Sequence, residues 1–262
     1  MTITREEQRE ALKEAGARLG RILDEVATLV APGVTTDVLN TRALELIRSG
    51  GDEPAFLDYT PDGAVRPYPA ALCVSVNDEV VHGIPNEAPR TLIEGDIVSL
   101  DLGLTHKGYV VDSALTVPVG RVDEKSTQLM EATARSLEEA IAAARVGGRI
   151  GDISHATEKA FKGTGFSVVR VLGGHGVGNS VHEEPWISNV GVPGTGPEIE
   201  DGMVLALEPI ANMGKASVIL APDGYTYRTK DGSRSAHFEH TILIEKNGTS
   251  VLTRRPSELR KA

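Results

Sequence analysis

The chain has 262 residues, of which 40% are hydrophobic and 24% are charged, and this ordinary composition excludes a disordered, collagen-like or coiled-coil protein. The net charge of −10 argues against a broad binding surface for nucleic acid or for an anionic membrane. A single cysteine cannot form an internal disulfide, and no apolar stretch approaches the roughly 18 residues that a membrane helix needs. We therefore expect a soluble, cytoplasmic, globular protein.

Hydrophobic periodicity predicts two helices in the first fifty residues. The first begins after Thr4 and ends before Pro32, and the second begins at Thr36 and ends at Gly50. Four prolines then predict an irregular loop over residues 52–70.

The remainder of the chain combines short apolar runs with two longer helical patterns. Strands are predicted at 72–76, 96–104, 109–117, 167–172, 203–208, 217–220 and 237–244, and helices at 123–145 and 152–163. No linker or change of composition divides the chain. The pattern predicts a single-domain α+β protein in which paired helices and clustered strands occur in both halves.

Two aspartates lie in a predicted hairpin. If its turn is centred between His106 and Lys107, Asp101 lies directly opposite Asp112, with about 5 Å between their Cβ atoms. Two carboxylates that close repel each other among apolar neighbours, so one is protonated, an arginine intervenes, or a cation binds between them. The alternative is a bulge that turns one aspartate to solvent.

Two histidines occur in unusual surroundings. His175 lies between glycines that allow a ligand to approach closely, and His182 follows seven residues later beside Glu183. A third, His82, is followed by Gly83 at the end of a predicted strand, where exposed functional loops occur. Taken alone, His175 and His182 each favour a hydrogen-bonded or exposed imidazole over a functional one, whereas for His82 a solvated loop histidine and a functional one are equally compatible with the sequence.

Two glutamates interrupt apolar runs. Glu208 ends the run that begins at Met203, and Glu239 lies in the run that ends at Ile244. A buried glutamate needs a partner, and neither run contains an arginine. Together with His175 and the two aspartates, these residues would form a five-ligand cluster for two divalent cations. Oxygen and nitrogen donors without a thiolate favour Mn, Fe, Co or Zn.

The cluster belongs to a series of seven motifs that resembles a known family. The motifs are, in order, Ser75-Val76-Asn77, Val80-Val81-His82-Gly83-Ile84-Pro85, Asp101 with Asp112, Gly174-His175-Gly176-Val177-Gly178, His182-Glu183-Glu184-Pro185, Leu207-Glu208-Pro209 and Phe238-Glu239-His240-Thr241. In these motifs the chain resembles the type I methionine aminopeptidases from about residue 4 to residue 255. The resemblance implies the α+β pita-bread fold, in which two pseudo-symmetric halves surround a curved antiparallel sheet and residues 1–262 form one catalytic metallopeptidase domain.

The resemblance also implies roles for the five ligands. Asp101 would hold one metal ion, His175 and Glu208 would hold the other, and Asp112 and Glu239 would bridge the pair. The cofactors would be two divalent ions, drawn from Co, Mn, Fe and Zn. Metal coordination lowers the pKa of bound water toward neutrality, which would supply the nucleophile.

Further positions match catalytic and substrate-binding residues of that family. Glu208 matches its general base, and His82 and His182 match residues that contact the scissile amide and stabilise the tetrahedral intermediate. The pocket for the methionine side chain would also include Tyr68, Cys73, Val181 and Tyr225, of which Val181 replaces a common Phe and Tyr225 replaces a frequent Trp. Residues 59–67 are expected to form a small insertion beside this pocket.

The implied activity is removal of the initiator methionine from nascent cytoplasmic proteins when the next residue is small. The implied partners are N-terminal Met peptides, nascent polypeptides and, transiently, the ribosome, and the enzyme would act as a monomer without nucleic acid or membrane.

Two alternatives remain. A proline-directed aminopeptidase or prolidase shares the metal ligands but usually carries a large additional N-terminal domain, whereas about 70 residues precede the first strand here. A non-enzymatic binding protein on the same fold would have lost ligands, and all five are present.

Overall fold

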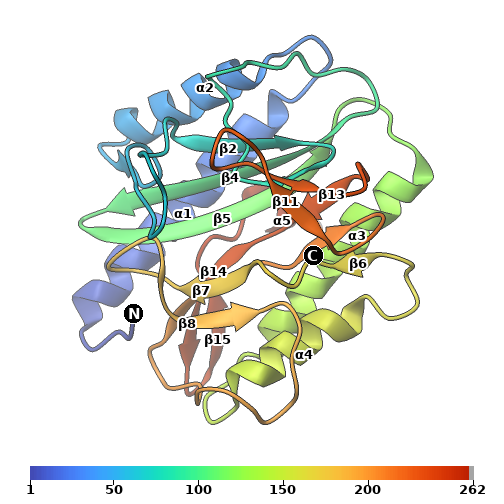
Figure 1. Cartoon of the computed structure of the whole chain (residues 1–262). Coiled ribbons are helices and arrows are strands. Elements are labelled where there is room, and N and C mark those ends of the chain that lie inside the picture. Colours follow the sequence, from blue (N-terminus) through green and yellow to red (C-terminus); the bar gives the residue numbers. More distant parts are fainter. Residues whose placement is uncertain (260–262) are drawn as a thin grey trace.

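The structure is a computed structural model that describes residues 1–259, and its long helices flank the β-strands on two sides (Figure 1). The helices are α1 (Glu6–Thr28), α2 (Thr36–Ser49), α3 (Glu124–Ala143), α4 (Ile150–Ala160) and α5 (Pro256–Leu259). The first four confirm the helices predicted from the sequence to within a few residues at each end. Among the described residues, no helix is long and apolar enough to cross a membrane.

In the first half of the chain, one central strand organises a four-stranded sheet. The strands are β1 (Glu53–Pro54), β2 (Leu72–Val76), β4 (Ile97–His106) and β5 (Tyr109–Pro118), and β4 pairs with all three others. Leu100, Leu102 and Leu104 of β4 are fully buried and join Leu12 and Leu19 of α1 in one apolar core. Because side chains alternate along a strand, Asp101 points to the opposite face.

The second half contains a five-stranded sheet in the order β15-β14-β9-β7-β8. Its strands are β7 (Gly173–Gly176), β8 (Glu183–Ser188), β9 (Val204–Leu207), β14 (His240–Glu245) and β15 (Gly248–Val251). α3 and α4 pack against each other, and they contact β9 and β8, respectively. Helices and sheet together form the second flank of the molecule (Figure 1).

Two three-stranded sheets complete the described fold. One contains β6 (Ser167–Val168), β10 (Ile210–Asn212) and β13 (Ser235–His237), and the other contains β3 (Glu79–Val81), β11 (Val218–Leu220) and β12 (Tyr227–Thr229). All named strand pairs in residues 1–259 are antiparallel. The α+β prediction with helices and strands in both halves is therefore confirmed.

The two halves are joined by a backbone contact between β5 and the connection from β13 to β14. The N–H of Ala114 donates to the carbonyl of Glu239 (3.3 Å), and the N–H of Glu239 donates to the carbonyl of Ala114 (2.9 Å). The N–H of Asp112 donates to Oγ1 of Thr241 (2.9 Å). These bonds bring Asp112 and Glu239 together from distant parts of the sequence.

The predicted register of the acidic hairpin is wrong. Asp101 pairs with Ala114, and Asp112 pairs with Gly103, so the aspartates are diagonal neighbours rather than directly opposite. The turn is centred one residue later than expected, because Lys107 and Gly108 both adopt positive φ (50° and 80°). Since this changes the pairing by two residues, both aspartates still point to the same face.

Two predicted strands are interrupted where the glutamates lie. β9 ends at Leu207, one residue before Glu208, because Pro209 has no N–H to continue the ladder. The predicted strand 237–244 is divided between β13 and β14, and Glu239 lies in the connection between them. The glutamates therefore follow or separate strands, where their side chains can turn toward the interior.

Close packing around Gly174 generates a prediction about stability. A Cβ atom at this position would lie 2.3 Å from the carbonyl oxygen of Ala206 in the neighbouring strand β9. Gly174→Ala should therefore lower the free energy of unfolding by about 3 kcal/mol or more, because two paired backbones must separate. Gly147→Ala is the control, since its positive φ (83°) has open space around it and should cost about 1–2 kcal/mol. Equal losses in urea unfolding would contradict the packing argument.

Candidate metal centre

One cavity between the two halves of the chain contains every site residue predicted from the sequence. It is lined by Asp101, Asp112, His175, Glu208 and Glu239, by His82 and His182, and by Tyr68, Cys73, Val181 and Tyr225. Four further residues, Phe56, Tyr59, Pro61 and His237, also line it. The structure thus brings the candidate ligands, catalytic residues and pocket residues together, and their individual roles stay predictions.

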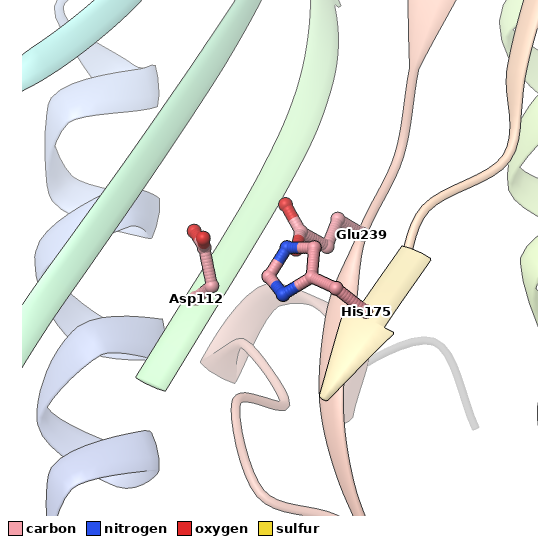
Figure 2. A group of neighbouring side chains, drawn as sticks. All are labelled: Asp112, His175 and Glu239. Carbon is pink, nitrogen blue, oxygen red and sulfur yellow. The ribbon is translucent and has the colours of Figure 1, made fainter. Parts of the chain in front are cut away.

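Three of the candidate ligands converge most closely. Asp112 extends from β5, His175 from β7 and Glu239 from the connection before β14, and their side chains point toward one another (Figure 2). All three are buried, and their potential ligand atoms lie within 4.8 Å of one another. This arrangement offers two carboxylates and one imidazole to a single ion.

The other two candidate ligands lie in the same cavity. Glu208 has its Oε1 atom 3.5 Å from Nε2 of His175, and its Oε2 atom lies 3.6 Å from Nε2 of His237. Asp101 is 8% exposed and contributes a buried oxygen from β4. In the described residues, neither Glu208 nor Glu239 lies within 4.0 Å of a lysine or arginine nitrogen, so neither forms a salt bridge with a lysine or arginine there.

Three of the four carboxylates have a buried oxygen without a hydrogen-bond partner among the described residues. Oδ1 of Asp101, Oδ1 of Asp112 and Oε1 of Glu239 are buried, and each is without a donor among the described residues. Burial raises the pKa of all four carboxyl groups, that of Glu208 included, and repulsion between neighbouring carboxylates raises the pKa of Asp112, Glu208 and Glu239 further. A bound cation would offset both the cost of burying these charges and the repulsion between them.

The imidazoles are suited to neutral ligation. Burial, with a smaller effect from His182, lowers the pKa of His175 to about 3, so its ring is neutral near pH 7. Nδ1 of His175 lies 3.0 Å from the carbonyl oxygen of Gly176, which fixes the proton on Nδ1 and leaves the Nε2 lone pair free. His175 therefore presents the nitrogen that a metal ion needs.

The donor set fits a hard or borderline divalent ion. It combines four carboxylates and an imidazole, the ligands that such ions prefer. Cys73 also lines the cavity, but burial raises the pKa of its thiol well above the ordinary value, so it is not a thiolate. The residues present therefore fit a divalent metal ion bound by oxygen and nitrogen.

The two candidate catalytic histidines lie at the border of this donor set. The ring of His182 packs edge-on against that of His175, with 4.6 Å between their centroids. His82 follows β3 with a positive φ of 58°, and its ring lies edge-on to Tyr227. A non-glycine residue in this backbone conformation is costly and is typical of functional sites.

An apolar wall lies beside the polar centre. Tyr68 and Tyr225 meet edge to face with 5.1 Å between their ring centroids, and the hydroxyl of Tyr68 donates to the carbonyl of Gly83 (2.8 Å). Cys73 and Val181 are buried in the same wall. Aromatic rings next to small apolar side chains form a surface that suits an unbranched, polarisable side chain.

Sequence reasoning missed four lining residues for two different reasons. His237 lies two residues before Glu239, and that alternation was a signal that both face the same side. Both ring nitrogens of His237 are buried without a partner, and burial lowers the pKa of this histidine to about 3. Phe56, Tyr59 and Pro61 belong to the irregular loop, and the last two lie in the segment 59–67 expected beside the pocket, but the loop has no periodicity that shows which of its side chains face the cavity.

The family profile, the sequence relatives and the solved structures that this chain resembles agree with one another. The sequence profile described as metallopeptidase family M24 matches residues 10–246. The chain is 42% identical over 246 residues to the methionine aminopeptidase of Aquifex aeolicus, covering 93% of this chain and 95% of that one. The crystal structure of methionine aminopeptidase from Thermotoga maritima superposes with a TM-score of 0.92 at 42% identity, covering 97% of this chain and all of that one. The prolidase from Pyrococcus furiosus gives a TM-score of 0.72 at 22% identity and is covered to only 65%.

The crowded carboxylates generate a prediction about Asp101→Asn. Without metal the substitution removes one of several repelling charges, so the variant should be at least as stable as the wild type at pH 7. With Mn²⁺ the order should invert, because the wild type binds the ion more tightly and gains more stability from binding. Thermal unfolding of both proteins, with and without Mn²⁺, provides the measurement.

The stability difference between Asp101→Asn and the wild type should also change with pH in a definite direction. Burial raises the folded-state pKa of Asp101 above its unfolded value, so its contribution to stability is present at low pH and is lost as the pH rises. Without metal, the stability that Asp101→Asn gains over the wild type should therefore shrink as the pH falls from 7 to about 4. A variant that melts below wild type by the same margin with and without metal would identify Asp101 as structural rather than a ligand.

Proposed function

The chain belongs to metallopeptidase family M24 and, within it, to the methionine aminopeptidases, and we propose that the cavity described above carries out their reaction. The enzyme is a metal-dependent hydrolase that removes the N-terminal initiator methionine, and its fold is the pita-bread fold. The likeness to prolidase is a likeness of fold alone, so the proline-directed alternative has no support of its own.

We propose that Asp101, Asp112, His175, Glu208 and Glu239 hold two divalent ions. The observation that carries the proposal is the group of buried, unpartnered carboxylates around a neutral imidazole in one cavity. When bound, such ions lower the pKa of water toward neutrality and polarise a peptide carbonyl. Mn, Fe, Co and Zn all accept this donor set.

Proton transfer is assigned to Glu208. Its side chain lines the cavity just after the end of β9, and burial raises its pKa and so favours its protonated form. A carboxyl group in this position can take a proton from water and return it to the leaving amine.

The histidines at the border bind the reacting peptide bond. Burial lowers the pKa of His82 to about 4 and also lowers the pKa of His182, so each is a neutral donor near pH 7. A ring N–H directed at the scissile amide stabilises the negative charge that develops on its oxygen.

The apolar wall binds the first side chain of the substrate. Tyr68, Cys73, Val181 and Tyr225 would surround a methionine thioether, which packs well against aromatic rings. Phe56, Tyr59 and Pro61 narrow the same cavity, which supports a preference for a small second residue.

We also propose that residues 1–262 act as one catalytic domain, as a monomer, on nascent chains in the cytoplasm and in transient contact with the ribosome. The support for a monomer is that all five candidate ligands come from one chain. The support for a reducing compartment is the single, unpaired Cys73.

Metal removal and refilling test the cofactor proposal. Chelation should abolish hydrolysis of Met-Ala-Ser, and stepwise addition of Mn, Fe or Co should restore it, because water is a sufficient nucleophile at neutral pH only near the ion. Xaa-Pro peptides should not be cleaved in any state. Full activity of rigorously metal-free enzyme would contradict the site, and preferential cleavage of Xaa-Pro peptides would restore the alternative.

His182→Ala tests the division between binding and chemistry. The variant should lose on the order of 10²-fold or more in kcat, because a donor to the transition state is removed, while its metal content stays near that of the wild type. Asp112→Asn is the matched control and should lose metal together with activity. Loss of metal from His182→Ala would mean that His182 is a ligand.

A further inference from the structure

Tyr59 makes a direct contact with His182, one of the two proposed catalytic histidines. The hydroxyl oxygen of Tyr59 lies 3.0 Å from Nδ1 of His182, and the two rings are tilted with 5.5 Å between their centroids. We propose that Tyr59 is a positioning residue that fixes the orientation and the tautomer of His182. This inference rests on the catalytic role proposed for His182.

The direction of the hydrogen bond follows from the chemistry of the two groups. A phenol is a good donor and a weak acceptor, whereas the unprotonated nitrogen of a neutral imidazole is a good acceptor. In the described residues, the Tyr59 hydroxyl has no partner other than Nδ1 of His182. The tyrosine therefore donates to Nδ1, and the ring proton of His182 resides on Nε2.

The N–H group at Nε2 of His182 is the one that can donate a hydrogen bond to a bound substrate. Nδ1 is occupied by Tyr59, and the backbone carbonyl of His182 accepts from Oγ of Ser180 (3.0 Å). The ring also packs against His175, so it borders the metal-ligating donor set. An Nε2–H group held in this position can donate to the oxygen of a scissile amide without first changing tautomer.

The backbone around Tyr59 fixes the tyrosine in place. The N–H of Asp58 donates to the carbonyl of Tyr68 (2.9 Å), and the N–H of Tyr68 donates to the carbonyl of Tyr59 (2.8 Å). These two bonds close the neck of the loop at residues 58–68, and the N–H of Tyr59 also donates to the carbonyl of Phe56 (3.0 Å). Tyr59 therefore extends from the hydrogen-bonded neck rather than from the exposed tip.

The far side of the loop is anchored as well. Arg66 forms an ion pair with Glu87, and its guanidinium donates to the carbonyl of Asp223 (3.2 Å). The carbonyl of Arg66 accepts from the hydroxyl of Tyr225 in the apolar wall. The loop is thus tied to two other segments, and the hydroxyl of Tyr59 is held in place before substrate arrives.

A double-mutant cycle tests the proposal in the metal-loaded enzyme. Tyr59→Phe keeps the ring and removes one neutral hydrogen bond, so kcat for Met-Ala-Ser should fall roughly twofold to tenfold, with little change in KM or metal content. In the His182→Ala background, Tyr59→Phe should have no further effect, because its target is gone. Tyr109→Phe is the control, because Tyr109 lies in β5 outside the cavity lining, and this substitution should change kcat in neither background.

The tautomer itself gives a readout that a purely structural role would not change. In the zinc-loaded enzyme, which is diamagnetic, ¹⁵N–¹H correlation spectra of the His182 ring should show the proton on Nε2. Tyr59→Phe should convert this signal to a mixture of the two tautomers.

The outcomes separate the inference from the proposed function. If His182→Ala retains full activity, the role of His182 is wrong. If His182→Ala is impaired but Tyr59→Phe is not, Tyr59 has no positioning role and the proposed function stands. An equal effect of Tyr59→Phe with and without His182, or an unchanged tautomer, would likewise overturn the inference.

Discussion

Four carboxyl groups share one buried cavity, and the free-energy cost of placing them together there explains much of the structure around them. Each charge is removed from water, each repels its neighbours, and no lysine or arginine among the described residues forms an ion pair with Glu208 or Glu239. The raised pKa values of these groups show that protonation relieves part of this cost without metal. The neutral imidazole of His175 and the protonated thiol of Cys73 add no opposing charge, so a bound cation is what would let the carboxylates stay ionised together.

The backbone is arranged to hold these groups despite their repulsion. Gly174 and Gly176 allow β7 to lie against its neighbours more closely than a side chain would permit, and His175 projects from between them. Pro209 ends β9 directly after Glu208, and the paired backbone bonds of Ala114 hold Glu239 against β5. The positions of these candidate ligands are therefore set by backbone pairing, which does not depend on the charges it brings together.

Much of this architecture could be predicted from the sequence, because helices and strands have characteristic periods and chemically unusual residues stand out within them. Asp101 and Glu208 were recognisable as charges in apolar runs. The hairpin register could not be predicted, because it depends on positive φ at Lys107, a residue that seldom adopts it. The position of Tyr59 depends on the closed neck of an irregular loop, and no local pattern encodes such a contact.

The bonds that join the two halves also determine when the enzyme can become active during its own synthesis. Oγ of Ser113 donates to the carbonyl of Glu239 across 126 residues of sequence. The first two candidate ligands precede this span, the next two lie within it, and Glu239 ends it. A contact between such distant residues closes late in folding, because the intervening chain must first lose much of its conformational freedom. An ion held by Glu239, as proposed above, binds a nearly finished structure rather than an early one. A growing chain that has not yet reached Glu239 lacks one of the five proposed ligands and the backbone bonds that join the two halves.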